Sequence, residues 1–305
     1  MKPLPAPFFQ RFWKTLIRLI GFLLCFLVIT GILAAAVFGL LPIPSPFVDG
    51  NDFSDVNIWS MVVLWAILSL ATYLSIQLFW VKIDKLALRP IGLSSHNFWP
   101  NFSYGTGLGV AMISIGYLLM LLFGVANLQA GTFLFFPFLG WLIFFLIQPF
   151  FEELLFRGYV LRLIERYFST WTAIIVSSIL FGLVHAPNEN FSLIGLLSIG
   201  LSGLLMGWLF VRTGSLWAPT GLHFSWNFFQ GVVFGYPTSG INTYQLLENQ
   251  YSGPEWLSGG EFGFEGSIIA VLLLLGVFVW DWRKGETAII ADIAVAESEQ
   301  DLADL

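Results

Sequence analysis

Long apolar runs recur along this chain, and they restrict it to folds in which helices cross a membrane. Of 305 residues, 57% are hydrophobic and 10% are charged, and the mean hydropathy is +0.82. A helical run of about 18 or more apolar residues is long enough to cross the hydrocarbon core of a bilayer. The first run is too long for the core of a signal peptide, so we expect it to be retained. We therefore predict an all-α, polytopic membrane helix bundle with about eight transmembrane helices, over residues 16–40, 58–80, 104–126, 132–151, 171–186, 193–211, 215–234 and 267–282.

The thirteen basic residues all fall on one side of this predicted bundle. They are Lys2, Arg11, Lys14, Arg18, Lys82, Lys85, Arg89, Arg157, Arg162, Arg166, Arg212, Arg283 and Lys284. The connections on the other side contain acidic residues and no basic ones. Lys and Arg accumulate on the cytoplasmic side of membrane proteins. We therefore predict an integral multi-pass membrane protein with both termini in the cytoplasm.

Three parts of the chain differ in composition. Residues 1–130 hold the first transmembrane helices and a basic connector, and residues 131–235 hold the helices with the polar motifs described below. Residues 236–305 hold an external loop, the last transmembrane helix and an acidic tail. Cys25 is the single cysteine, which excludes a disulfide framework and a cysteine-based metal site. No basic arm is present, so the expected partners are the lipid bilayer and membrane-associated molecules, not nucleic acid.

Two adjacent carboxylates, Glu152 and Glu153, follow a long apolar run. A charge at bilayer depth costs roughly 3 kcal/mol or more unless it is partnered, so an intramembrane acid is a candidate functional residue. Neighbouring residues on a helix point about 100° apart, so the two acids cannot serve the same face. Glu153 and Arg157 are four residues apart and can form an ion pair along one side. Glu152 is then free to meet a different partner.

Two of the three histidines, His185 and His223, lie in late apolar segments. If the chain reverses near residue 168, Glu152 and His185 each lie 16 residues from the reversal. At about 1.5 Å per residue, both are then about 24 Å deep on neighbouring antiparallel helices. This equal depth requires the helix that carries Glu152 to run well past residue 151.

His223 and Asn227 lie one helical turn apart, on one face of a later segment. His223 follows Gly214 by nine residues, so it reaches the same depth only if the chain reverses below the membrane surface or the helix tilts. An acid, two imidazoles and a carboxamide around one cavity form a suitable set for hydrolysis. Glu152 can act as general base on a water, with His185 orienting or sharing the proton. His223 and Asn227 can donate hydrogen bonds to the oxyanion of a tetrahedral intermediate.

Three motifs stand in order along the chain: Glu152-Glu153-x-x-x-Arg157, Phe181-x-x-x-His185 and His223-x-x-x-Asn227. Together they resemble the motifs of the CPBP family of intramembrane proteases, which includes CAAX prenyl endopeptidases and bacteriocin self-immunity proteins. The resemblance covers about residues 135–235. It implies a glutamate-dependent intramembrane endopeptidase that needs no cofactor and cleaves a membrane-associated protein or peptide, in a prokaryotic inner membrane.

The resemblance also implies a role for each motif residue. Glu152 is then the catalytic glutamate, and His185 is its partner in water activation. His223 and Asn227 form the oxyanion-stabilising pair. Glu153 and Arg157 form a supporting pair.

The residues by themselves leave other functions open. Glu152, His185 and His223 can supply three zinc ligands with water in the fourth position, although the chain has no HExxH motif. Acids and histidines in membrane spans also build proton relays, which favours a proton-coupled transporter. A non-catalytic membrane partner protein, which holds a peptide or another protein without cleaving it, is the third alternative.

Overall fold

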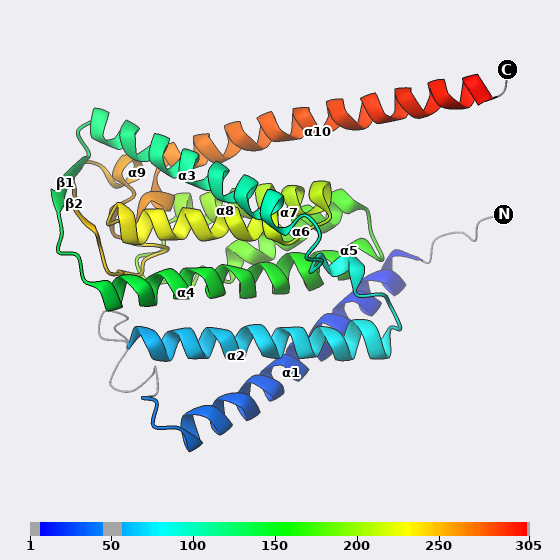
Figure 1. Cartoon of the computed structure of the whole chain (residues 1–305), viewed down its shortest axis with the longest axis horizontal. Coiled ribbons are helices and arrows are strands. Elements are labelled where there is room, and N and C mark those ends of the chain that lie inside the picture. Colours follow the sequence, from blue (N-terminus) through cyan, green and yellow to red (C-terminus); the bar gives the residue numbers. More distant parts are fainter. Residues whose placement is uncertain (1–6, 45–56, 304–305) are drawn as a thin grey trace.

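The computed structural model describes residues 7–44 and 57–303. Lys2, Asp49, Asp52 and Asp55 lie outside the described residues. Most helices run side by side along one direction, and α1 is tilted across them (Figure 1). The elements are α1 (Phe8–Leu40), α2 (Ile58–Ile76), η1 (Gln77–Ile83), η2 (Arg89–Ile91), α3 (Phe98–Leu122), β1 (Ala126–Ala130), α4 (Phe135–Glu153), η3 (Leu154–Leu161), α5 (Arg162–Glu165), α6 (Thr170–Leu183), α7 (Leu193–Thr213), α8 (Trp217–Phe228), η4 (Phe229–Val233), β2 (Leu247–Tyr251), α9 (Glu255–Ser258), η5 (Gly260–Phe262), η6 (Phe264–Gly266) and α10 (Ile268–Ala303).

The structure is that of a polytopic helical membrane protein. Each of the eight predicted apolar runs is helical over most of its length. Within the described residues, five helices are long and apolar enough to cross a bilayer by themselves: Phe8–Leu40, Ile58–Ile83, Phe98–Leu122, Phe135–Glu165 and Leu193–Thr213. α6 is apolar but has only 14 residues, so the count of eight crossings stays a prediction.

Large apolar side chains cover the outer surface of the helices. On α1, Leu27 and Val28 are each 61% exposed and Ile32 is 64% exposed. Water would disfavour so large an apolar surface, whereas lipid tails solvate it.

The prediction of an all-α fold is wrong in one respect, because the chain also forms a small antiparallel sheet. β1 pairs with β2 so that Ala126 lies opposite Tyr251. α3 stops at Leu122, and Gly124 then turns the chain with a φ of 70°, which glycine adopts at little cost. The two strands are far apart in the sequence, so no local periodicity predicts their pairing.

The two ends of the bundle differ in charge. The end that we call the sheet end carries β1, β2 and the connections 184–192 and 234–267, and its described residues include no Lys or Arg. The opposite end, called the basic end, holds the start of α1 and the far part of α10 (Figure 1). There the Asp84 carboxylate forms ion pairs with Arg18 at 2.8 Å and with Arg166 at 3.0 Å. Arg157 is buried inside the bundle, and the other described basic residues lie in segments at the basic end. Which end faces the cytoplasm stays a prediction.

The helix that begins at α4 extends beyond the predicted span of 132–151, as the equal depth of Glu152 and His185 requires. It passes residue 151 and continues through the π-helix η3 and α5 to Glu165. Ser169 then caps α6, since its hydroxyl accepts from the Thr172 amide at 3.1 Å. The wide π turns begin directly after Glu153, and π segments within helices are frequent at functional sites.

The connector after η1 folds back against the start of α8. Ile91 is fully buried. The Gly92 carbonyl accepts from the Leu216 amide at 3.0 Å, and the Ser94 carbonyl accepts from the Trp217 indole at 2.8 Å. α8 therefore begins against protein rather than at the membrane surface.

Candidate active site

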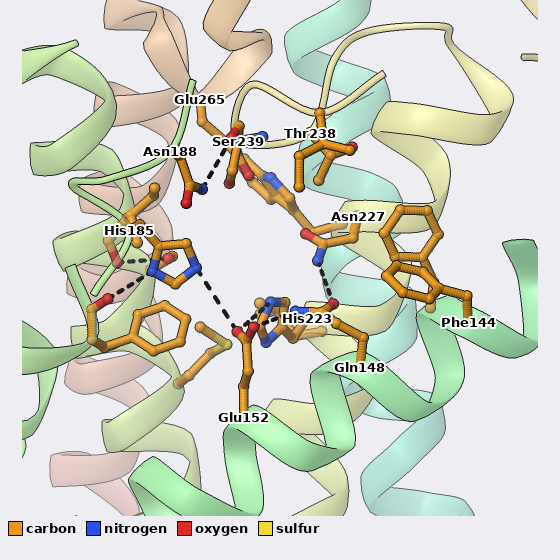
Figure 2. Close-up of a pocket in the computed structure, with 18 of the residues that line it drawn as sticks. Phe144, Gln148, Glu152, His185, Asn188, His223, Asn227, Thr238, Ser239 and Glu265 are labelled. Carbon is orange, nitrogen blue, oxygen red and sulfur yellow. Dashed lines mark hydrogen bonds and ion pairs between the residues drawn. The ribbon is translucent and has the colours of Figure 1, made fainter. Parts of the chain in front are cut away.

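Glu152 points into a cavity between α4, α6, α7 and α8 (Figure 2). Its Oε1 accepts a hydrogen bond from the Gln148 amide, one turn earlier on α4. Its Oε2 lies 3.9 Å from His185 Nε2 and 3.8 Å from His223 Nε2. Among the described residues, this buried oxygen has no direct hydrogen-bond partner. A buried polar atom of this kind marks a place where water or a substrate binds.

His185 is oriented by the main chain of α6. Its Nδ1 lies 2.7 Å from the Phe181 carbonyl oxygen. Because a carbonyl can only accept, Nδ1 carries the proton, and Nε2 of the neutral ring turns a lone pair toward Glu152. The structure brings these two side chains together, as their equal spacing from the chain reversal predicted.

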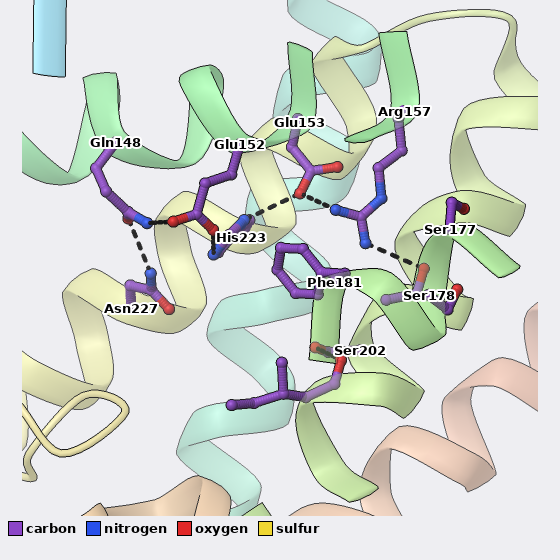
Figure 3. Close-up of polar contacts among 12 residues, drawn as sticks. Gln148, Glu152, Glu153, Arg157, Ser177, Ser178, Phe181, Ser202, His223 and Asn227 are labelled. Carbon is purple, nitrogen blue, oxygen red and sulfur yellow. Dashed lines mark hydrogen bonds and ion pairs between the residues drawn. The ribbon is translucent and has the colours of Figure 1, made fainter. Parts of the chain in front are cut away.

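His223 is oriented by the second acid of the pair. Glu153 Oε1 lies 3.0 Å from His223 Nδ1 and 2.8 Å from Arg157 Nη1. The predicted ion pair of Glu153 and Arg157 is therefore present, with side chains that are 0% and 1% exposed. Glu152 and Glu153 leave α4 in different directions, as their helical spacing predicts. They nevertheless approach opposite nitrogens of the same imidazole, so the prediction that Glu152 meets a different partner is only partly right (Figure 3).

Arg157 lies behind the cavity wall, next to Phe181, which lines the cavity. Its Nη2 donates to the Gly203 carbonyl at 3.1 Å. Its guanidinium carbon lies 4.3 Å from the centre of the Phe181 ring. The same ring meets the His223 ring edge-on, with 5.9 Å between centres. A buried cation is stable here because an acid, a carbonyl and an aromatic face all surround it.

His223 reaches the depth of Glu152 because α8 starts inside the bundle. His223 lies only six residues after Trp217, the first residue of α8, whereas Glu152 lies 13 residues before Glu165, where α5 ends. The connector that covers the start of α8 accounts for this difference. These contacts favour the first of the two solutions that the sequence left open, a reversal below the membrane surface.

Gln148 is a site residue that the sequence analysis missed. Its amide nitrogen donates to Glu152, and its amide oxygen accepts from Asn227 Nδ2 at 3.2 Å. It thereby links α4 to α8 and sets the position of both side chains (Figure 3). Gln148 stands four residues before Glu152 and therefore lies on the same helical face, and this spacing could have indicated its role.

The cavity has a volume of about 300 Å³. Its wall is mainly apolar and aromatic, which suits the side chains of a membrane-embedded peptide. The apolar residues of the wall include Trp65, Trp141, Phe144, Phe145, Met206 and Trp226.

Glu265 is a second acid at this cavity that the sequence analysis missed. It lies in η6, and its Oε2 accepts from the Ser239 amide at 2.7 Å and the Ser239 hydroxyl at 2.9 Å (Figure 2). Burial raises the pKa of the Glu265 carboxyl, and the bonds from Ser239 oppose that rise. From the sequence alone, Glu265 belongs to the external loop, because nothing local indicates that the loop folds over the cavity.

The described residues contain no group of three or more His, Cys, Asp or Glu arranged to hold a metal ion. The imidazole nitrogens of His185 and His223 face Glu152 from 3.9 Å and 3.8 Å. The zinc alternative therefore stays a prediction from the sequence.

Comparisons with known proteins agree with the motif prediction. Residues 134–229 match the family described as Type II CAAX prenyl endopeptidase Rce1-like. No curated protein matches the chain. The matched residues include Glu152, Glu153, Arg157, His185 and the pair on α8, while Glu265 lies outside them. Over residues 134–229, the chain thus carries a domain of the Rce1-like type II CAAX prenyl endopeptidase family, which is a family of proteases.

Proposed function

We propose that this protein is a glutamate-dependent intramembrane endopeptidase that cleaves a peptide bond in a membrane-associated protein. The observation that carries the proposal is the unpartnered Oε2 of Glu152 between the Nε2 atoms of His185 and His223. A gap of 3.9 Å is too long for a direct hydrogen bond but is spanned by one water. Glu152 takes the proton of that water, and His185 orients it from Nε2.

The oxyanion of the tetrahedral intermediate is stabilised from α8. Asn227 donates from Nδ2, whose second N–H is free of the bond to Gln148. His223 Nε2 also faces this site, and it donates to the oxyanion when both ring nitrogens carry a proton, because Nδ1 already lies 3.0 Å from Glu153 Oε1. Each such donor is worth about 10²–10³-fold in kcat when water is excluded.

Each of the three parts of the chain has its own role in this proposal. Residues 131–235 supply the catalytic helices, and residues 1–130 and 236–305 supply the supporting helices, the external loop and the acidic tail. We place the protein in a prokaryotic inner membrane, with a protein or peptide as its partner and with no cofactor.

The test compares cells that produce the wild type with cells that produce Glu152→Gln, and identifies new protein N-termini in their membranes by mass spectrometry. Glu152→Gln and His223→Ala should remove the cleavage products, with a loss of about 10²–10⁴-fold in the rate for the general base. Glu248→Gln makes the same chemical change on an exposed residue of β2 and should have no effect. Thermal unfolding of the purified variants controls for folding.

Three results would contradict parts of this proposal. Normal cleavage by Glu152→Gln refutes the mechanism. Loss of activity with a strong chelator supports zinc instead. Proton-driven solute uptake in liposomes without any cleavage supports the transporter.

A further inference from the structure

His185 lies past the end of α6, in a connection that has few bonds of its own. α6 ends at Leu183, and the connection covers residues 184–192. The His185 amide donates to the Gly182 carbonyl at 3.1 Å, and the His185 carbonyl accepts from the Asn188 amide at 3.1 Å. No residue of this connection is buried. Contacts from other segments therefore decide how firmly His185 is held in the cavity.

The segment that packs against this connection is a tight turn of residues 238–241. The Thr238 amide donates to the Ile241 carbonyl at 2.9 Å, and the Ile241 amide donates to the Thr238 carbonyl at 3.0 Å. Both residues between them have positive φ, 50° at Ser239 and 86° at Gly240. Two central residues of positive φ are typical of the tightest hairpin turns. A serine in this region is strained, so other contacts must stabilise it.

Two contacts join the turn to the connection that carries His185. The Asn188 side-chain amide donates to the Ser239 carbonyl at 3.0 Å. A Cβ atom at Gly240 would lie 2.2 Å from the Glu189 carbonyl oxygen, so the two backbones touch. A displacement of the turn therefore displaces the connection, and with it the main chain of His185.

Glu265 holds the turn from its other side. This acid is 6% exposed. Its Oε2 accepts from both the amide and the hydroxyl of Ser239, at 2.7 Å and 2.9 Å. The neighbouring Phe262 carbonyl accepts from the Gly240 amide at 2.9 Å. Both central residues of the turn are thus fixed by the segment that carries Glu265, and this stabilises the strained conformation of Ser239.

We propose that Glu265 is a positioning residue for His185 and acts through Ser239 and Asn188. This inference rests on the proposed function and adds to it a residue outside the matched segment 134–229. Each step of the path is a hydrogen bond, from the Glu265 carboxylate to Ser239, from the Ser239 carbonyl to the Asn188 side chain, and from the Asn188 amide to the His185 carbonyl (Figure 2). The path needs an acceptor at residue 265, and it does not need a charge there.

The kinetic test uses a quenched fluorescent peptide that spans a cleavage site found by the Glu152 comparison. Glu265→Ala removes the acceptor and should lower kcat by up to about 10²-fold with little change in KM, because a shift of His185 misplaces the attacking water. Glu265→Gln keeps an oxygen that can accept both Ser239 bonds, so it should restore most of kcat. Glu255→Ala, at an exposed position of α9, is the control and should match the wild type. A loss in Glu265→Gln as large as in Glu265→Ala overturns the inference, because the charge or proton of the acid would then be needed.

The path itself is tested by combining Glu265→Ala with Asn188→Ala. Both changes break the same series of contacts, so the double variant should lose no more kcat than the more impaired single variant. Losses that multiply in the double variant overturn the inference, since the two residues would then act independently.

Hydrogen exchange of the purified full-length protein in detergent tests the inference without a substrate. Amides of residues 184–192 should exchange faster in Glu265→Ala than in the wild type, while Glu265→Gln and α6 should stay as protected as in the wild type. If Glu265→Ala does not fold, Asn188→Ala breaks the same path and should give the same pattern. Unchanged exchange of residues 184–192, or equal acceleration in α6, overturns the inference.

The two proposals fail in different ways. Normal cleavage by Glu152→Gln refutes the proposed function, and the exchange pattern then still decides whether Glu265 holds the connection of residues 184–192. Unchanged exchange in Glu265→Ala overturns the positioning role even where cleavage depends on Glu152.

Discussion

Each imidazole in the cavity is oriented by one acceptor behind its ring. For His185 this is the Phe181 carbonyl, and for His223 it is the Glu153 carboxylate. Both rings therefore turn Nε2 toward Glu152. The acceptor behind His185 is a neutral carbonyl, and the acceptor behind His223 is a carboxylate. We therefore expect the two rings to have different tasks, with His223 at the oxyanion and His185 at the water.

The buried pair of Glu153 and Arg157 should behave as one unit in unfolding experiments. Glu153→Gln or Arg157→Gln leaves one uncompensated buried charge, so each should destabilise the protein by about 3–5 kcal/mol. The double variant removes both charges and should cost clearly less than the sum of the singles. Thermal unfolding of the three purified variants in detergent measures this coupling. Additive losses would mean that the pair is not an electrostatic unit.

Glu265 should make stability depend on pH. Its folded-state pKa is raised by burial above the ordinary 4.5, so the folded protein holds a proton that the unfolded chain releases. The contribution of this group is fully present below about pH 4.5 and is lost as the pH rises through the folded-state pKa. The polar groups around the carboxyl are Ser239, Gln230 and His185.

Glu265→Gln replaces the carboxyl with a neutral group of the same shape. As the pH rises above about 4.5, the unfolding temperature of the wild type should fall relative to that of Glu265→Gln. Glu255→Gln, at an exposed position of α9, is the matched control and should follow the wild type. Parallel pH curves for wild type and Glu265→Gln would show that Glu265 does not titrate in this range.

At the scale of elements, the position of α8 depends on close contact with α3. A Cβ atom added at Gly105 of α3 would lie 1.9 Å from the Ala218 carbonyl oxygen, and one at Gly109 would lie 2.2 Å from the Ser225 hydroxyl. Small residues let helix backbones approach in this way, and such packing holds membrane helices together where lipid removes the hydrophobic driving force. The contact fixes the helix that carries His223 and Asn227.

Gly105→Ala should therefore separate the two helices. We expect a destabilisation of about 1–3 kcal/mol together with reduced cleavage, because the methyl group cannot fit and α8 must shift. Gly107→Ala on the same helix is the matched control, since its Cβ would meet no described atom within 4 Å. Melting and cleavage assays of both variants test this. Equal behaviour of the two would exclude a packing role for Gly105.

At the scale of the whole molecule, polar clusters at the basic end join helices that are distant in the sequence. Asp281 of α10 is fully buried. It accepts hydrogen bonds from the Tyr104 hydroxyl of α3 at 2.5 Å and from the Trp208 indole of α7 at 2.9 Å, and it forms an ion pair with Arg212 of α7 at 3.1 Å. The cluster holds three helices together without contributing to the lining of the cavity.

Asp281→Ala should weaken the whole bundle without altering the chemistry. It leaves the Trp208 indole and the Tyr104 hydroxyl without their acceptor, at a cost of about 1–3 kcal/mol for the buried indole. The unfolding temperature should drop, while the folded fraction keeps normal cleavage because Asp281 does not line the cavity. A loss of cleavage in protein that is still folded would show that the cluster also positions α7 at the site.

Local features of the chain were enough to predict most of its elements and motifs. Apolar runs predict the helices, because a segment in lipid must satisfy its own backbone hydrogen bonds. The spacing of Glu153 and Arg157 predicts their ion pair, because i and i+4 share a helical face. The motif order predicts the family domain, which the match over residues 134–229 confirms. Residue roles in catalysis stay proposals.

The tertiary structure alone decided how these elements meet. Gln148, Glu265 and the pairing of β1 with β2 depend on contacts between segments that are far apart in the chain. The recessed start of α8, covered by residues 89–94, sets the depth of His223. Periodicity records which face of a helix is buried, but it carries no information about which distant segment covers that face. For this reason the sequence determined the spans and the reactive side chains, and only the fold decided that these side chains surround one cavity.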